Sequence, residues 1–337
     1  MRFSSLSETE EYSRESGRIG AERPGEEHAG EERPGEEHLD IEHTGGDCSG
    51  IERIGAERPC EEHAGEERPD CEGLFSRTEM LVGSEAMDKL ATAKVAVFGL
   101  GGVGGSCAEA LARSGVGSLD LFDGDVVSLS NINRQVIALH STVGRPKAGV
   151  MAERIRDINP ACRVRVCEMF YMPDTAGVVD ISLYDYVVDA IDTVAGKVEL
   201  IERAKSAGVK IICSMGAAYR MDPTQFVVTD IQKTEADPLA RVMRKELRAR
   251  GISDVKVVWS RETPLRRCGE NHPHCDEPCN EASRNELIQA HLPGGTPNSH
   301  LPASSANSHL PASSSFVPPA CGLVLASEVV KDLIGSA

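Results

Sequence analysis

The sequence predicts an α/β fold, a doubly wound and mainly parallel sheet with a smaller C-terminal continuation. Two observations support this prediction. From about residue 74 onward, short apolar runs alternate with segments of helical periodicity, which is typical of parallel strands joined by crossover helices. The first run, Val95–Phe98, leads directly into the glycine-rich segment Gly99–Gly104, as in the strand-to-helix turn of Rossmann-like folds.

The expected elements alternate along the chain. The strands cover residues 95–98, 119–122, 164–166, 186–188 and 211–213, and the helices cover residues 107–114, 148–158 and 198–207. A strand at 226–228, a charged helix at 239–250, a strand at 255–259 and a final helix at 322–334 continue the pattern. We expect residues 74–265 to form the nucleotide-binding domain, which a C-terminal strand and helix in residues 316–337 complete.

Two segments differ from that domain in composition. Residues 1–76 hold 22 Asp and Glu against 8 Lys and Arg, so they carry −14 of the whole-chain charge of −17. Within them, residues 18–34 recur as residues 53–69 with one change. Because this segment has too little apolar surface to offset its chain entropy, we expect residues 1–73 to be a disordered acidic tail. Residues 266–315 are rich in Ser, Pro and Gly, which is typical of a low-complexity insertion.

Composition favours a cytoplasmic protein. The sequence contains no apolar run long enough to span a membrane, and its N-terminus has no secretory or transit pattern. Its eleven cysteines are odd in number and include no Cys-x-x-Cys pair, which fits reduced thiols. Cys268, Cys275 and Cys279, with His272 and His274 between them, could bind zinc, but their irregular spacing favours uncoordinated thiols.

Gly99, Gly101 and Gly104 predict a nucleotide site. Glycines in such a turn let the backbone approach a phosphate, and the free N–H groups of the following helix point at it. Asp123 stands nineteen residues past Gly104, at the end of the second strand, where a carboxylate can accept hydrogen bonds from ribose hydroxyls. The alternative is that the glycines only permit a tight turn and that Asp123, like Asp125, is a turn residue.

The cations that follow favour ATP over a dinucleotide. Arg134 stands in the segment Asn131–Gln135, and Lys147 directly precedes the helix expected at 148–158. ATP brings about four negative charges, which a guanidinium and an ammonium can neutralise. A surface ion pair would also explain Arg134. Lys147 could simply begin its helix, but a cation there is poorly placed unless an anion lies nearby.

Taken in order, the motifs resemble the ubiquitin-activating-enzyme superfamily of ATP-dependent adenylating proteins. These motifs are Gly99–Gly104, Asp123–Val126, Asn131–Gln135, Val143–Lys147, Ile158–Pro160 and Asp189–Asp192. A second set resembles the family of tRNA threonylcarbamoyladenosine dehydratases: Ser214–Ala218, Met221–Gln225, Thr229–Thr234, Asp237–Leu239 and Ser315–Pro319. The resemblance covers about residues 74–265 and 314–335. It implies ATP-dependent dehydration, by cyclisation, of N6-threonylcarbamoyladenosine in tRNA through a carboxyl adenylate.

The resemblance also implies roles for single residues. Arg134 and Lys147 would act on the phosphates, and Asp192 would hold Mg²⁺ against them, with Asp189 only ending its strand. Arg77 would reach into the site of a partner subunit, which implies a homodimer. The expected nucleotide-binding residues are Gly99, Gly101, Gly102, Gly104, Asp123, Asn131, Asn133 and Gln135.

A basic segment is the expected tRNA contact. Residues 240–267 hold nine Lys and Arg against three acidic residues, and positive charge of this kind can bind phosphates. The leading contacts are Arg241, Arg244, Lys245 and Arg248. A charged helix face is more often simply solvated, so the assignment depends on the resemblance.

Other functions share the same ATP residues. An adenylyltransferase acting on the C-terminus of a ubiquitin-like sulfur carrier is the main alternative, but many such proteins carry paired Cys-x-x-Cys zinc ligands that this chain lacks. A non-catalytic adaptor and an NAD oxidoreductase are further alternatives. The sequence leaves open a sulfur- or electron-transfer partner protein.

Overall fold

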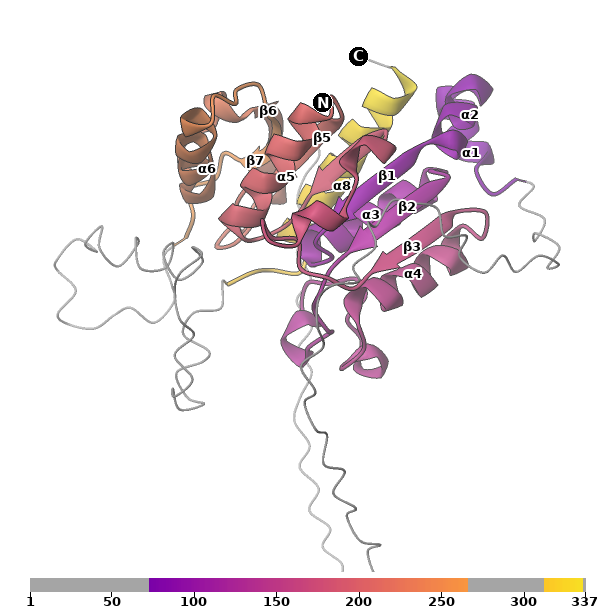
Figure 1. Ribbon diagram of the computed structural model, residues 1–337. Helices are drawn as coiled ribbons and strands as arrows, with labels where there is room; N and C mark the ends of the chain where they lie inside the picture. The colour runs from indigo at the N-terminus through magenta and orange to yellow at the C-terminus, as the bar shows by residue number, and fades with distance from the viewer. Residues whose placement is uncertain (1–72, 266–311, 336–337) are drawn as a thin grey trace, which may run out of the picture. The chain divides into compact units, whose positions relative to one another are not determined.

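The computed structural model describes residues 73–265 and 312–335, whose strands form one seven-stranded sheet (Figure 1). The strands are β1 (Lys94–Phe98), β2 (Ser118–Phe122), β3 (Arg163–Cys167), β4 (Tyr186–Asp189), β5 (Lys210–Ser214), β6 (Phe226–Asp230) and β7 (Lys256–Ser260). Their order across the sheet is β3-β2-β1-β4-β5-β7-β6. Every neighbouring pair is parallel except β6 with β7. The predicted mainly parallel sheet is confirmed.

Helices cover both faces of this sheet. They are α1 (Ser76–Val82), α2 (Ser84–Thr92), α3 (Gly102–Arg113), α4 (Lys147–Ile158), α5 (Val194–Ser206), α6 (Pro238–Ala249) and α8 (Val317–Ile334). Short 3-10 helices are η1 (Leu129–Asn131), η2 (His140–Thr142), η3 (Ala176–Val178), η4 (Ile181–Leu183), η5 (Pro223–Gln225) and η6 (Ile231–Lys233). Apolar side chains of α3, α4 and α8 form one core, and those of α5 and α6 form the other. The doubly wound arrangement is confirmed.

The C-terminal segment differs from its prediction. It forms helix α8 alone, and residues 312–335 contain no strand where we expected a strand and a helix. The helix begins at Val317, five residues earlier than expected, with Pro318 in its first turn, where the missing proline N–H breaks no helical bond. Its Gly322 lies so close to α3 that an added Cβ would stand 2.2 Å from the Val103 carbonyl oxygen.

Helix α3 also begins earlier than predicted, at Gly102 rather than residue 107. Glycine has a low helix propensity, so its first turn gives no sequence signal. Helices α1 and α2 were not predicted either. No residue of α1 is buried, so the segment has no apolar periodicity to show, and Gly83 at φ +86° separates it from α2.

Several predictions concern residues outside the described ranges. They are the tail through residue 72, most of the insertion, and the three cysteines at 268, 275 and 279. Within the part of the chain that the structure describes, no helix combines the length and the apolar character needed to cross a membrane. The same part contains no group of three or more His, Cys, Asp or Glu placed to hold a metal ion.

Candidate nucleotide site

The sheet reverses its direction of growth between β1 and β4, its topological switch point. Strand β2 follows on one side of β1, and β4 and β5 follow on the other. In open α/β sheets, ligands bind in the crevice outside the carboxyl ends of the strands at this point. The turn after β1, Gly99–Gly102, and the turn after β4, Ala190–Thr193, therefore border the candidate site.

Two glycines of the glycine-rich segment, Gly99 in the turn and Gly104 in the first turn of α3, serve backbone packing. Gly99 has φ +85°, and an added Cβ would lie 2.6 Å from the carbonyl oxygen of Ala190. A Cβ on Gly104 would lie 1.8 Å from the carbonyl oxygen of Gly99. These contacts bring the turns after β1 and β4 together, so no other residue fits either position without a backbone shift.

The two glycines between them face different neighbours. Added to Gly102, a Cβ would stand 2.9 Å from Pro318 of α8 and 3.0 Å from the Arg134 carbonyl oxygen. A Cβ added to Gly101 would have one neighbouring atom within 4 Å, the Gln135 Nε2 atom at 3.9 Å. Gly101 is therefore the position where the turn leaves room for a ligand beside the first turn of α3, whose N–H groups have no partner within the helix.

Asp123 links this turn to the end of β2. Its carboxylate accepts hydrogen bonds from the backbone N–H groups of Leu100, at 2.6 Å, and Asp125, at 2.8 Å. Burial raises the pKa of Asp123 above its ordinary value, although the nearby Lys147 ammonium and the two N–H donors lower it. The carboxylate is thus fixed beside the glycine turn, where it can accept hydrogen bonds from ribose hydroxyls.

Lys147 is the first residue of α4, and its ammonium pairs with Asp125 at 2.7 Å. The lysine side chain is only 7 % exposed, and its backbone N–H donates to the Asp125 carbonyl oxygen. The structure thus supplies the anion that a cation at the positive end of a helix requires. Asp125, expected to be only a turn residue, is thus the partner of Lys147, and the position of Lys147 at a helix start could have suggested this pairing.

Residues 131–135 lie against the glycine turn, and their side chains differ in environment. Asn131 is buried and accepts the Ser128 N–H at 3.1 Å, which fixes the local 3-10 turn η1. Gln135 is buried with an Oε1 atom that has no hydrogen-bond donor among the described residues. Arg134 donates to the Ser130 carbonyl oxygen at 2.9 Å and to the Asn133 Oδ1 atom at 3.1 Å.

The two aspartates after β4 are in opposite environments. Asp189 is fully buried and pairs with the Lys197 ammonium of α5 at 2.9 Å. Asp192 is exposed in the following turn, and its carboxylate has no hydrogen-bond or ion-pair partner in residues 73–265 or 312–335. Asp192 thus has a carboxylate available for a cation, whereas Asp189 has a structural partner that sequence spacing alone did not reveal.

Phe170 is a further residue of this site that the sequence analysis missed. It follows β3, and its side chain is 60 % exposed. A Cβ added to Gly124 would lie 2.7 Å from the Phe170 ring, so glycine lets the ring pack against the backbone of the residue that follows Asp123. An exposed aromatic ring next to the candidate ribose-binding carboxylate is suited to contact a base. The only sequence signal was a large apolar residue beyond the end of a strand.

The remaining predicted residues are not joined to this site by any described contact. Arg77 is exposed on α1 and has no side-chain partner within the described part of the chain. Of the four cations on α6, Arg241 and Lys245 are exposed, but Arg244 is half-buried and donates to Thr234, whose carbonyl oxygen lies at 2.8 Å. Arg248 donates to the Gln232 side chain at 3.4 Å.

Comparison with known proteins gives consistent matches. The model of the ThiF family matches residues 75–337. A tRNA threonylcarbamoyladenosine dehydratase of Bacillus subtilis is 41% identical over 264 residues, covering 77% of this chain and 94% of that protein. The crystal structure of the E. coli tRNA N6-threonylcarbamoyladenosine dehydratase TcdA in complex with ATP superposes with a TM-score of 0.62 at 33% identity, covering 80% of this chain and 98% of that one. The molybdopterin-synthase adenylyltransferase of E. coli is 34% identical over 145 residues, which is 43% of this chain.

Proposed function

This chain belongs to the ThiF family, and from that premise we propose that it is an ATP-dependent tRNA threonylcarbamoyladenosine dehydratase. The observation that carries the proposal is the crevice between β1 and β4, where a glycine turn, Asp123 and the buried Lys147 lie together. The relatives with that name, one of them solved with ATP, match most of this chain and support the same substrate.

The reaction activates an acid and then closes a ring. A carboxylate oxygen of the threonylcarbamoyl group attacks the α-phosphorus of ATP, and the bond to the β-phosphate breaks to release pyrophosphate. The carbamoyl group of the same nucleoside then attacks the acyl carbon, and AMP leaves with the carboxylate oxygen. The nucleoside has lost one water, and ATP has become AMP and pyrophosphate.

Charge is the main requirement of the first step. Negative charge builds on the leaving pyrophosphate, and pre-oriented cations stabilise it in a site that excludes water. We assign this role to Lys147, which Asp125 holds in place, and to Arg134, which Asn133 and Ser130 orient. Gly101 admits the phosphates, and Gln135 contributes its unpartnered Oε1 atom or its amide group to the nucleotide.

The residues present fit a magnesium ion brought by ATP. Mg²⁺ is usually bound through one or two carboxylates together with substrate phosphates and water, so a single exposed carboxylate is sufficient. Asp192 is that carboxylate, since Asp189 is engaged by Lys197. When bound, the ion would neutralise charge on the phosphates of ATP.

Homodimer formation through α1 is also part of the proposal. Met80 and Leu81 on this helix are 88 % and 84 % exposed, an unusual state for neighbouring large apolar side chains. Arg77, one turn earlier on the same helix, would be carried toward the partner subunit by such an interface. The α6 cations with no partner among the described residues, Arg241 and Lys245, are the best placed of the four to bind tRNA phosphates.

Four buried thiols of the described residues lack the reactivity that a thioester step would need. Burial raises the pKa of Cys162 and Cys321 to about 12, and raises those of Cys107 and Cys213 as well. Thiols of this kind stay protonated at neutral pH and are poor nucleophiles, so none of the four suits a thioester step. Reduced thiols are also the basis for proposing a cytoplasmic location. A sulfur- or electron-transfer partner protein is not required by this chemistry.

The test compares two acceptors. The full chain is incubated with ATP, Mg²⁺ and either tRNA that carries threonylcarbamoyladenosine or a ubiquitin-like sulfur carrier, and AMP is measured. AMP release only with the modified tRNA, together with a nucleoside lighter by one water, supports the dehydratase. AMP release only with the carrier protein would instead establish the adenylyltransferase, and release with neither would contradict both.

A further inference from the structure

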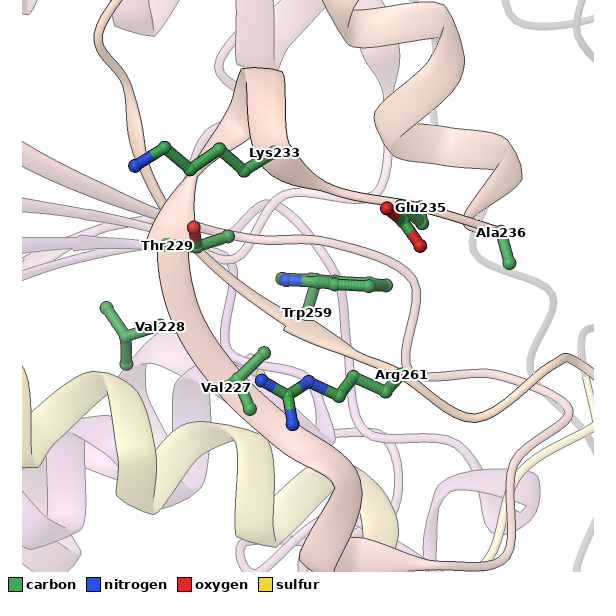
Figure 2. Close-up of a pocket in the computed structure, with 8 residues that line it drawn as sticks. All are labelled: Val227, Val228, Thr229, Lys233, Glu235, Ala236, Trp259 and Arg261. Carbon is green, nitrogen blue, oxygen red and sulfur yellow. The ribbon is translucent and has the colours of Figure 1, made fainter.

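We propose that a second pocket, at the β6 edge of the sheet, binds one unpaired nucleotide of the tRNA substrate, an inference that rests on the proposed function (Figure 2). The pocket lies between β6, the end of β7 and the segment that joins η6 to α6. Its lining residues are Val227, Val228, Thr229, Lys233, Glu235, Ala236, Trp259 and Arg261. None of them belongs to the candidate nucleotide site.

The strongest evidence is the indole of Trp259. This side chain is only 6 % exposed, and its Nε1 atom is buried with no hydrogen-bond acceptor among the described residues. A buried indole N–H normally has a partner, because leaving it unpaired costs about 1–3 kcal/mol of stability. Figure 2 shows the indole lying across the pocket with its nitrogen end toward Thr229. The N–H thus points toward the Thr229 wall of the pocket and is left without an acceptor there.

Two cations share the pocket with the indole. Arg261 and Lys233 are both exposed, and neither side chain forms an ion pair or hydrogen bond in the described part of the chain. Figure 2 shows the Arg261 guanidinium below the indole and Lys233 above Thr229. With Glu235 as the one acidic residue beside these two cations, the pocket lining carries a net charge of +1. The pocket therefore favours a ligand that carries negative charge beside an apolar, hydrogen-bonding surface.

Size restricts the ligand to about one nucleotide. The cavity measures about 380 Å³, near the lower end of the range for small-molecule sites, and it cannot admit a duplex. Valine, alanine and indole surfaces suit a base or ribose, and the two cations suit the flanking phosphates. Proteins that bind unpaired RNA use this combination of aromatic surface, arginine and phosphate contacts.

Position connects the pocket to the reaction. Strand β7 is parallel to β5, with Val258 opposite Ser214, so Trp259 and Arg261 lie at the same carboxyl edge as the crevice. Strand β5 in turn pairs with β4, which borders the crevice. Neighbouring strands are about 4.8 Å apart, so β7 lies roughly 10 Å from β4. A single strand of RNA could place its modified adenosine at the crevice and a nearby nucleotide in the pocket.

The test measures tRNA binding separately from turnover. Fluorescently labelled tRNA that carries threonylcarbamoyladenosine is titrated with the full chain over a series of salt concentrations. We expect the double variant Lys233→Ala and Arg261→Ala to bind it about tenfold more weakly, and Trp259→Phe, which keeps the ring and removes the N–H, to bind it severalfold more weakly. Losing two phosphate contacts should reduce the slope of log Kd against log salt by about 1.4.

Controls separate the pocket from general charge and from the ATP site. Arg163→Ala removes an exposed cation from β3, at the opposite edge of the sheet, and should leave tRNA affinity unchanged. ATP affinity should be unchanged in every pocket variant. Both substitutions in the double variant are on exposed side chains, so its folding is not at risk.

Each outcome decides the inference. Unchanged tRNA affinity and salt slope in the double variant would overturn it, as would an equal loss in Arg163→Ala. Saturable binding of free uridine monophosphate, lost in the double variant with no change in tRNA binding, would assign the pocket to a free nucleotide instead. If the wild type releases no AMP but binds tRNA through the pocket, the proposed function fails, and the pocket remains a tRNA-binding site without a link to the dehydratase reaction. If the wild type binds no tRNA, both fail.

Discussion

Lys147 and Arg261 are both cations at the carboxyl edge of one sheet, yet their surroundings differ. Lys147 is buried against Asp125, and nearby Asp123 is fixed by two backbone N–H groups. Arg261 is exposed, with no side-chain partner in the described part of the chain, as is Lys233. A site for a small ligand that reacts in one geometry benefits from groups that are already held in place. A polyanion can instead be bound by exposed cations, because phosphate contacts gain free energy from counterion release.

The largest effect is expected from removing the cations of the candidate nucleotide site. Lys147→Ala and Arg134→Ala should each lower kcat for AMP release by about 10²–10³, since each removes a cation aimed at the developing charge. The Lys147→Ala protein should fold because the Asp125 carboxylate that it leaves unpaired is 54% exposed, and the Arg134→Ala protein should fold because it loses only hydrogen bonds to nearby Ser130 and Asn133. Steady-state kinetics with modified tRNA measures the effect. The matched control is Arg145→Ala, which removes an exposed cation of the same loop that pairs with Glu153. Normal pyrophosphate release by the Lys147 and Arg134 variants would contradict the assignment.

The next effect separates packing from binding within the glycine turn. Gly104→Ala should destabilise the protein by about 3 kcal/mol or more, because its Cβ would stand 1.8 Å from a backbone oxygen. Gly101→Ala should lower the unfolding free energy by less than about 1 kcal/mol, because the atom nearest to the new Cβ is 3.9 Å away. The same substitution should weaken ATP binding. Urea denaturation and calorimetry with ATP measure the two quantities. Equal destabilisation by both substitutions would show that Gly101 is a packing residue as well.

A smaller effect tests which α6 cations are available to tRNA. Arg244→Ala should lower the unfolding free energy by about 1–2 kcal/mol, because it removes hydrogen bonds to Thr234 and Ile231. Lys245→Ala, on an exposed neighbour, should leave stability within about 0.5 kcal/mol and weaken tRNA binding modestly. Thermal denaturation and tRNA titration of the pair give the answer. We expect Arg244→Ala to cause the larger loss of stability and Lys245→Ala the larger loss of tRNA affinity. The same variant showing the larger loss in both assays would refute this assignment.

The smallest expected effect is a pH dependence at Asp123. Burial raises the pKa of its carboxyl in the folded protein, so the folded state holds the proton more tightly than the unfolded state. That contribution to stability is fully present below the unfolded value and is lost as pH rises through the raised pKa. Wild type should therefore lose stability relative to Asp123→Ala as pH rises through this window. AMP affinity, which needs the carboxylate, should rise over the same window. Urea unfolding and AMP titration of both proteins check the two slopes.

The sequence predicted the inner strands of the sheet well because their apolar runs are buried on both faces. The run at 186–188 became β4 and the run at 211–213 became β5, each with small changes of boundary. The glycine turn and Asp123 were found by spacing, and the structure brings them together. Local patterns sufficed for the glycine turn because it is formed by consecutive residues, and for Asp123 because it directly follows a strand that lies beside β1.

Other features depend on tertiary packing and left no local pattern. The buried pair of Asp189 and Lys197 joins a strand end to the first turn of α5, and nothing in its spacing distinguishes it from a solvated pair. Arg244 is indistinguishable in sequence from Arg241, and only the fold shows that it bonds Thr234. The Trp259 pocket joins two strands and a loop, so no motif could have revealed it.

The central claim is that the crevice between β1 and β4 transfers the α-phosphorus of ATP to a carboxylate. The most direct test uses tRNA whose threonylcarbamoyl carboxylate is labelled with ¹⁸O, with mass spectrometry of the products. The account predicts that AMP gains one ¹⁸O atom and that the cyclised nucleoside keeps one. Unlabelled AMP, or ¹⁸O in inorganic phosphate beside ADP, would contradict it.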